Sequence, residues 1–355
     1  MVTAIVNARV FDGQDVIGEP NVILDGTQVL GVDVPMPAGA VVVDGTSATL
    51  LPGLIDSHVH TDRGGLRDAL TFGVTTELEM QGHWSPKARQ QITTRDDIAD
   101  LRTSGMGVRT KGGHPSEYVT SGSLLMRLVY PLMPSVNTPA QARHFVAKQV
   151  ASGADYIKVF IEDGSTIGYP GLPVINQPTL LAAIDAAHEH SKLVIAHATT
   201  ADAARRAIAS GVDGLAHLFL DAPTPGLIDA IAESGAFVVP TLVTLSSAFG
   251  RSAVELASDP SVQARLSQPW LDSLRRSMNA YPQGDLDTSF ASVRALRDAR
   301  VDILAGSDVS EPLPMLGGLA HGASLHHELQ LLVQAGLTPV EALRAATSVP
   351  APGSS

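Results

Sequence analysis

"LPGLIDSHVHTD" occupies residues 51–62. In it an apolar run ends in two histidines, His58 and His60, with one residue between them. Successive side chains of a β-strand point to opposite faces, so residues two apart share a face. If residues 53–60 form a strand, both imidazoles project together, as two ligands of one metal ion would. Two histidines near a strand end are more often ordinary polar residues. The metal interpretation therefore depends on what the rest of the chain offers.

The composition is that of a large globular protein with an acidic balance. Of 355 residues, 44% are hydrophobic and 17% charged, which suits either one large α/β barrel or about two to three ordinary domains. The formal net charge of −12, without a basic run, argues against nucleic acid or an anionic membrane as partner. Cysteine is absent, so a metal site needs His, Asp, Glu or a modified Lys. The N-terminal sequence has no signal-like segment and no apolar run reaches membrane-spanning length, so we expect a cytoplasmic protein.

The pattern of apolar residues changes at Leu51. Residues 1–50 carry short alternating apolar runs separated by Gly, Asp and Pro, which predicts the small strands of a partial N-terminal β-sandwich. From there on, apolar runs alternate with Ala-rich helical patterns, and a glycine often stands between a helix and the next run, as a C-cap would. This alternation predicts an α/β fold, a (β/α)8 TIM barrel over residues 51–355 and not an open sheet. The predicted barrel strands are 53–60, 73–80, 107–113, 154–160, 192–198, 214–219, 236–242 and 301–308.

One connection in the predicted barrel is unusually long. Residues 243–289 follow the seventh predicted strand and are helical in part. Loops that follow barrel strands lie over the active face, so we interpret this insertion as a lid or a substrate-pocket element. An additional pair of packing helices is the alternative.

A polar residue stands at the end of several predicted strands, where barrel enzymes place their chemistry. Each has an ordinary explanation when taken alone: a core histidine with a hydrogen-bond partner, an aspartate that caps a helix, or a lysine that reaches solvent. Together, at one end of one barrel, they favour a single site. These residues are His58, His60, Lys158, His197, His217 and Asp308.

The order of these residues along the chain resembles that of the amidohydrolase superfamily. "LPGLIDSHVH" is very close to the opening motif of that superfamily. "GADYIKVF", which contains Lys158, and "VIAHA", which contains His197, look like the branch that includes Xaa-Pro dipeptidases and imidazolonepropionase-like hydrolases. The resemblance covers nearly the whole chain.

This resemblance implies a binuclear metal centre in which Lys158 is carboxylated by carbon dioxide. A carbamate is an anion with two oxygens, so it can bridge two cations, and it would explain a lysine inside an apolar strand. Zinc suits nitrogen and oxygen ligands, and manganese and iron stay open. The resemblance assigns His58, His60 and Asp308 to one ion and His197 and His217 to the other.

The resemblance also implies hydrolysis of a carbonyl C–N bond. The pKa of a water that bridges two dications falls from about 15.7 to roughly 7, and the hydroxide would attack a carbonyl polarised by the second metal. Asp308 would take the proton and pass it to the leaving amine. His114, after the third predicted strand, is the candidate for a hydrogen bond to a substrate carbonyl or carboxylate, with a solvent-exposed loop histidine as the alternative.

We expect a small-molecule substrate: an amide, a dipeptide or an N-acyl amino acid. A lactonase or esterase, a phosphotriesterase and a non-catalytic degenerate barrel are the alternatives. The chain departs from the resemblance in three places. Thr199 stands where many relatives have a second histidine, and Ala216 replaces the glutamate of a Glu-His-Gly motif whose glycine is here Leu218. Relatives also continue beyond "ATSVPA" to complete the β-sandwich, so we expect exposed edges on the N-terminal strands, or a second subunit of a homo-oligomer that covers them.

Overall fold

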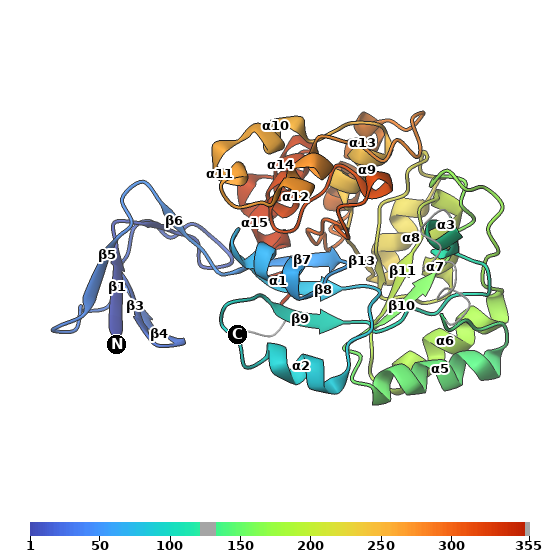
Figure 1. The fold of residues 1–355 in the computed structure, drawn as a ribbon, viewed down its shortest axis with the longest axis horizontal. Helices are drawn as coiled ribbons and strands as arrows, with labels where there is room; N and C mark the ends of the chain where they lie inside the picture. The colour runs from blue at the N-terminus through green and yellow to red at the C-terminus, as the bar shows by residue number, and fades with distance from the viewer. Residues whose placement is uncertain (121–132, 352–355) are drawn as a thin grey trace.

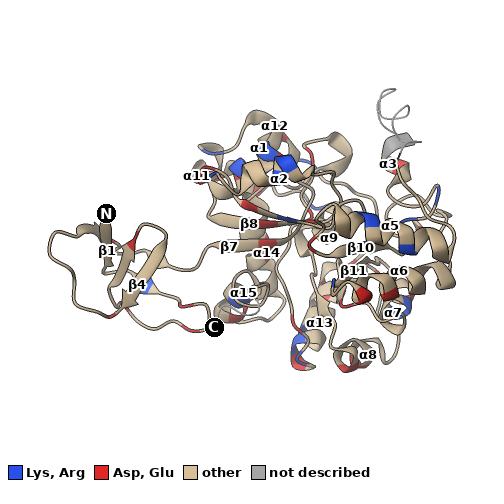
Figure 2. Cartoon of the chain, turned by 90° about the horizontal axis from the view of Figure 1, so that it is seen from below, with Lys and Arg blue, Asp and Glu red and all other residues tan. Residues whose placement is uncertain are grey.

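The computed structural model describes residues 1–120 and 133–351, which form a small N-terminal β-region and a β/α barrel. Figure 1 shows the N-terminal strands at the left, beside the barrel, with the barrel strands enclosed by helices. The predicted (β/α)8 barrel with a small N-terminal β-region is therefore confirmed. Acidic and basic side chains are interspersed over the barrel (Figure 2).

Short alternating apolar runs make the N-terminal sheet, whose strand order is β4-β3-β1-β5. β1 pairs antiparallel with β3 and parallel with β5, and a turn at Gly26, with a φ of 57°, joins β3 to β4. A separate two-stranded ladder of β2 and β6 leads into the barrel. The strands are β1 (Val2–Val6), β2 (Arg9–Val10), β3 (Val22–Asp25), β4 (Gln28–Val32), β5 (Val41–Asp44) and β6 (Thr49–Leu50).

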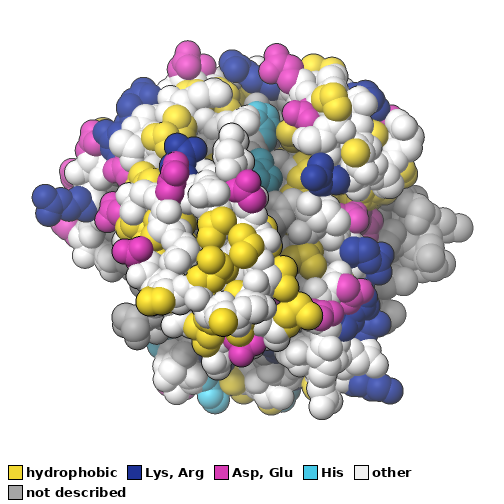
Figure 3. Space-filling model, turned by 90° about the vertical axis from the view of Figure 1, so that its left-hand side faces the viewer, with side chains coloured by type: hydrophobic (Ala, Val, Ile, Leu, Met, Phe, Trp, Pro, Cys, Tyr) yellow, Lys and Arg dark blue, Asp and Glu magenta, His cyan; other side chains and the backbone are white. Residues whose placement is uncertain are grey.

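The outer strands of this sheet expose apolar side chains. Val29 on β4 is 64% exposed and Val42 on β5 is 53% exposed. Figure 3, which views the molecule from this side, shows apolar side chains gathered on the surface that faces the viewer. The exposed valines and leucine of the two edge strands are Val29, Leu30, Val32, Val41, Val42 and Val43.

The barrel strands form two parallel sheets. β7, β8 and β9 make one, and β10, β11, β12 and β13 make the other. Every ladder within both sheets is parallel, as βαβ units require. Their bounds are β7 (Leu54–Val59), β8 (Val74–Glu79), β9 (Asp100–Thr103), β10 (Ile157–Phe160), β11 (Val194–His197), β12 (Gly214–Leu215) and β13 (Phe237–Val238).

Single bridges and hydrogen bonds join the two sheets into a closed barrel. The segment around residues 303–309 takes the eighth position between β13 and β7. The amide of Ser57 donates to the carbonyl of Ala305 at 2.9 Å, which ties this segment to the first strand. The bridges pair Val108 with Val159, Val238 with Ile303 and Val59 with Val309.

The predicted third strand, 107–113, is wrong. The third strand is β9, where exposed and buried side chains alternate, and in 107–113 only Val108 forms a bridge. Gly107, Gly112 and Gly113 interrupt the later stretch, and glycine weakens a strand because it contributes no side chain to the packing. The alternation in "DLRT" was the better signal.

Helices cover the barrel, and their ends follow the expected cap chemistry. The Thr200 side chain accepts a hydrogen bond from the amide of Ala203, so Thr200 is the N-cap of α7. Gly235 ends α8 with a φ of 72°, directly before β13. The helices are α1 (Arg63–Leu70), α2 (Pro86–Ile92), α3 (Ser116–Thr120), α5 (Pro139–Ala151), α6 (Gln177–Glu189), α7 (Ala201–Ala209), α8 (Leu227–Ser234), α9 (Leu242–Ala248), α10 (Val254–Ser258), α11 (Pro260–Gln263), α12 (Gln268–Leu274), α13 (Leu286–Asp298), the short 3-10 helix η2 (Pro314–Leu316), α14 (Ala323–Gln334) and α15 (Pro339–Ala345).

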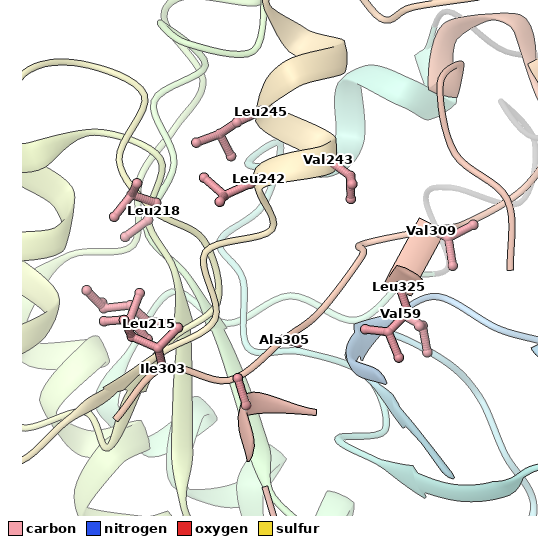
Figure 4. Close-up of a cluster of buried hydrophobic side chains, with 14 of the residues drawn as sticks. Val59, Leu215, Leu218, Leu242, Val243, Leu245, Ile303, Ala305, Val309 and Leu325 are labelled. Atoms are coloured by element: carbon pink, nitrogen blue, oxygen red, sulfur yellow. The ribbon is translucent and has the colours of Figure 1, made fainter. Parts of the chain in front are cut away.

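Buried aliphatic side chains connect the strands with the helices around them (Figure 4). Leu215 on β12 and Ile303 of the last strand segment belong to the same core as Leu242 and Leu245 of α9. Leu215, Leu242 and Leu245 are each no more than 1% exposed. This packing fixes the strand ends on which the polar site depends.

Residues 243–289 contain α10, α11 and α12, and much of the segment is packed against the barrel. Trp270 is 9% exposed, and its ring meets the ring of His321 edge-on at 5.3 Å. The Ser273 hydroxyl donates to the carbonyl of Leu319 at 2.8 Å. These contacts anchor one part of the segment, and its role as a lid stays a prediction. In the two described ranges, every helix is too short or too polar to traverse a lipid bilayer.

Candidate metal centre

His58 on β7 and His60, directly after that strand, meet one aspartate of the last strand segment. Nε2 of His58 and Nε2 of His60 each lie 3.2 Å from Oδ1 of Asp308. The amide of Asp308 also donates to the carbonyl of His58 at 2.7 Å. Asp308 adopts a φ of 55°, a left-handed conformation that aspartate tolerates better than most residues. The backbone thus turns this carboxylate toward the histidines.

His217 joins the group from the segment that follows β12. Its ring centroid lies 4.6 Å from that of His58 and 4.6 Å from that of His197. One ligand atom each from His58, His217 and Asp308 lies within 4.8 Å of the other two. These three residues therefore form a group that could hold a metal ion.

Hydrogen bonds behind two of the rings decide which nitrogen faces the group. Nδ1 of His58 lies 2.7 Å from the carbonyl of Ala216, which can only accept, so Nδ1 carries the proton. Nδ1 of His217 lies 2.9 Å from the hydroxyl of Thr241. In both rings Nδ1 makes the hydrogen bond, and Nε2 is the nitrogen that faces the group.

The charges around the group favour neutral histidines beside an anionic carboxylate. Burial, followed by the charge of Lys158, lowers the pKa of His58 to about 4. Burial also lowers the pKa values of His197 and His217 well below their usual range. Burial favours the protonated form of Asp308, but the neighbouring histidines outweigh it and hold its pKa well below the usual range. Metal ligands need these protonation states.

Lys158 on β10 is buried beneath the same group. It is 1% exposed, and Nζ has no hydrogen-bond partner in residues 1–120 and 133–351. Burial lowers its pKa to about 7, against the opposing charges of Asp308 and Glu79. A lone ammonium is costly in such a setting, so about half of the amine is neutral at pH 7 and most of it is neutral at higher pH.

His197 and His114 lie next to each other at the edge of the group. Their rings stack with centroids 4.4 Å apart and planes 24° apart. Nε2 of His197 lies 3.0 Å from Oε2 of Glu162, and Nδ1 of His114 contacts Oε1 of Glu117. His114 is 8% exposed, so the loop histidine is not a solvated one.

Three residues near the histidines were not predicted from the sequence. Glu79 at the end of β8 is buried, and burial raises its pKa to about 7. Glu162 and Thr241 each contact a histidine of the group. Glu162 continues the alternation of Lys158 and Phe160 by two residues, a signal that could have revealed it. Thr241 lies in a left-handed turn that no sequence pattern indicated.

Arg109, which follows β9, is engaged in hydrogen bonds to the main chain. It is 3% exposed, and its guanidinium donates to main-chain carbonyls on both sides of α3. The acceptors are Gly113 at 3.3 Å, Met133 at 3.3 Å and Pro134 at 3.2 Å.

Known proteins share both this sequence pattern and this fold. An uncharacterized protein of Mycobacterium tuberculosis (strain ATCC 25618 / H37Rv) is 25% identical over 322 residues, which are 88% of this chain and 75% of that protein. A solved Xaa-Pro dipeptidase with bound methionine is similar with a TM-score of 0.72 and 22% identity, covering 98% of this chain and 87% of the other. Molinate hydrolase gives a TM-score of 0.71 at 18% identity over 99% and 84%. Phenylurea hydrolase B gives 0.68 at 20% identity over 98% and 86%.

At these identities the solved structures establish the fold alone. The family model described as "Amidohydrolase family" matches residues 49–352. The match therefore includes every barrel strand together with the strand ends that carry His58, His217 and Asp308. This chain belongs to the amidohydrolase family.

Proposed function

We propose that this chain is a hydrolase that cleaves a carbonyl C–N bond at a binuclear metal centre. One observation carries the proposal. Because Nδ1 of His58 donates to a carbonyl, Nε2 of the neutral ring bears a lone pair, and this atom faces the Asp308 carboxylate at 3.2 Å. Two acceptors face each other there, and Nε2 of His58 has no hydrogen-bond partner among the described residues. A cation that binds both atoms resolves this repulsion.

The donor set suits two divalent ions. His58, His60 and Asp308 would hold one ion, and His197 and His217 would hold the other. Imidazoles and carboxylates without thiolates are ligands that zinc accepts readily. The buried Nζ of Lys158 has no hydrogen-bond partner within residues 1–120 and 133–351, and it would supply the remaining position once carboxylated.

The environment of Lys158 supports the proposed carboxylation. A neutral amine attacks carbon dioxide at carbon, one proton leaves, and the lysine becomes an anionic carbamate with two oxygens. Burial lowers the pKa of Lys158 to about 7, so much of the amine is neutral when the protein meets carbon dioxide at neutral pH. The resulting carbamate would remove the cost of a buried ammonium, and its two oxygens would be available as ligands.

The chemistry divides between the ions and the residues of the chain. Bound divalent ions would lower the pKa of a water to roughly 7 and polarise the substrate carbonyl. Asp308 accepts the proton of the attacking water and delivers it to the leaving nitrogen. His114, stacked on His197, is within the same group and orients the substrate carbonyl by a hydrogen bond.

We propose amides, dipeptides or N-acyl amino acids as substrates. Neighbours of the same fold are named as a Xaa-Pro dipeptidase, a prolidase and a phenylurea hydrolase. These names support small substrates, and the leaving nitrogen that Asp308 can protonate supports the C–N bond.

Metal analysis combined with a substrate panel tests the proposal. Protein produced with zinc and bicarbonate should contain about two zinc ions per chain and should hydrolyse members of an amide and dipeptide panel faster than lactones and phosphotriesters. One ion or none, or faster turnover of lactones or phosphotriesters, would contradict it. Zinc-free protein, restored with zinc and bicarbonate, serves as the control for contaminating hydrolases.

A further inference from the structure

The strand that carries Lys158 continues into a buried carboxylate that the proposed reaction does not use. The Glu162 side chain is 1% exposed, and its Oε1 accepts a hydrogen bond from the amide of Gly164 at 2.7 Å. Gly164 has a φ of +83°, and a Cβ there would clash with the carbonyl oxygen of Tyr169, so the turn requires glycine. The backbone therefore fixes the position of this carboxylate.

The second oxygen of Glu162 receives two side chains. Nε2 of His197 lies 3.0 Å from Oε2, and the Thr199 hydroxyl donates to the same oxygen at close range. Oγ1 of Thr166 lies 2.6 Å from Oγ1 of Thr199. Because the Thr199 proton points to the carboxylate, Thr166 is the donor in that pair. The two hydroxyls thus form a chain that ends on Glu162 and holds its orientation.

This support differs from that of the other histidines. Nδ1 of His58 is hydrogen-bonded to a carbonyl, and Nδ1 of His217 is hydrogen-bonded to a hydroxyl. His197 is supported through Nε2, and its acceptor is a carboxylate. The ring of His197 is therefore reversed relative to the other two, with Nδ1 as the nitrogen left for the centre.

We propose that Glu162 is a positioning residue that keeps the proton of His197 on Nε2 and so presents Nδ1 as a ligand atom. Thr199 takes part by fixing the carboxylate. An ionised acceptor behind an imidazole selects the tautomer and makes the opposite nitrogen more basic, and such partners change metal affinity by about 10–100-fold. The effect on metal affinity rests on the proposed function, whereas the tautomer of His197 does not.

The tautomer can be measured in metal-free protein. Two-bond 1H–15N correlation spectra of protein with 15N-labelled histidine distinguish a proton on Nδ1 from one on Nε2, and a His197→Asn variant assigns the His197 signals. We expect His197 to carry its proton on Nε2 and His58 to carry it on Nδ1. A wild-type His197 with the proton on Nδ1 overturns the proposal, and the tautomer itself is read from the wild-type protein.

Zinc competition against a chelator tests the consequence. Glu162→Gln keeps the side-chain size but removes the charge, so one zinc ion should bind about 10–100-fold more weakly, with a mixture of His197 tautomers in the metal-free protein. Thr199→Val should weaken zinc binding by less than Glu162→Gln, and Thr199→Ser should bind zinc as the wild type does. Asp163→Asn, which removes an exposed carboxylate next to Glu162, is the matched control and should behave as the wild type.

Two outcomes separate this proposal from the proposed function. Unchanged zinc affinity and an unchanged tautomer in Glu162→Gln overturn the role of Glu162 even if the enzyme is active. Wild-type protein that binds no zinc but keeps the His197 proton on Nε2 contradicts the binuclear function and leaves the positioning role of Glu162 supported.

Discussion

His58 and Asp308 contact each other twice, once through their side chains and once through their backbones. Nε2 of His58 lies 3.2 Å from Oδ1 of Asp308, and the amide of Asp308 donates to the carbonyl of His58 at 2.7 Å. The second contact belongs to the closure between the first strand and the last strand segment. The candidate metal centre and the closed barrel therefore depend on the same pair of residues, and an ion bound there stabilises the closed barrel by mass action.

Replacement of Asp308 by asparagine should separate catalysis from metal binding. The amide keeps an oxygen ligand but cannot accept the proton of the attacking water, so kcat/KM should fall by about 10²–10⁴-fold while most of the zinc stays bound. Steady-state kinetics and elemental analysis of the same preparation measure both quantities. Asp302→Asn, which alters an exposed carboxylate in the same segment, is the control and should leave both unchanged. Near wild-type turnover in Asp308→Asn would remove Asp308 from the proposed mechanism.

Because Lys158 is buried, the stability of the metal-free protein should rise with pH. Its pKa is about 7 in the folded protein and near 10.5 in the unfolded chain, so between these values the unfolded chain binds the extra proton. Stability therefore rises with pH across this window, and below about pH 7 the cost of the buried ammonium is fully present. Lys158→Met, which removes the amine, should be more stable than metal-free wild type at pH 6 by roughly 3–5 kcal/mol, and the difference should shrink toward pH 10.

Urea unfolding of metal-free protein at several pH values measures this difference. Lys148→Met, on the exposed surface of α5, is the matched control: it keeps Lys158, so its stability should follow the pH dependence of the wild type. The same Lys158→Met variant should also lose the effect of bicarbonate on zinc uptake. Equal pH dependence in Lys158→Met and wild type would show that Lys158 is not the buried amine described here.

The barrel and the strand-end residues could be predicted because their signals are local in sequence. An apolar run that ends in a polar residue, as at His58 or His197, needs no knowledge of distant contacts. The predicted third strand was wrong because residues 107–113 contain three glycines and a single apolar side chain, Val108. Propensity decides poorly there, because tertiary pairing selects the segment that fits beside β8.

The contacts of the supporting residues could not be predicted because they depend on how the chain turns after each strand, although the alternation of Lys158, Phe160 and Glu162 places Glu162 on the same side as Lys158. The amide of Gly164 donates to the Glu162 carboxylate that contacts His197, and Thr241, which contacts His217, has a left-handed φ of 49°. A sequence without the fold shows only a glutamate after the apolar run "VFI" and a threonine inside "VVPTLV". Their importance appears once the distances to the imidazoles are known.

Glu328 should give the metal-free protein the opposite pH dependence to Lys158. Its carboxyl group, on α14, accepts hydrogen bonds from the amides of Leu242 at 3.0 Å and Val243 at 2.8 Å, and burial raises its pKa to about 8. Between about pH 4.5 and pH 8 the folded protein holds a proton that the unfolded chain has lost, so this group makes stability fall as pH rises through that window. Glu328→Gln cannot titrate, so its unfolding free energy should fall less steeply between about pH 5 and pH 8, although the loss of one acceptor should lower it by about 1 kcal/mol near pH 5. Urea unfolding measures both effects, with Glu233→Gln on the exposed face of α8 as the control, and an unchanged slope in Glu328→Gln would show that Glu328 does not titrate in this window.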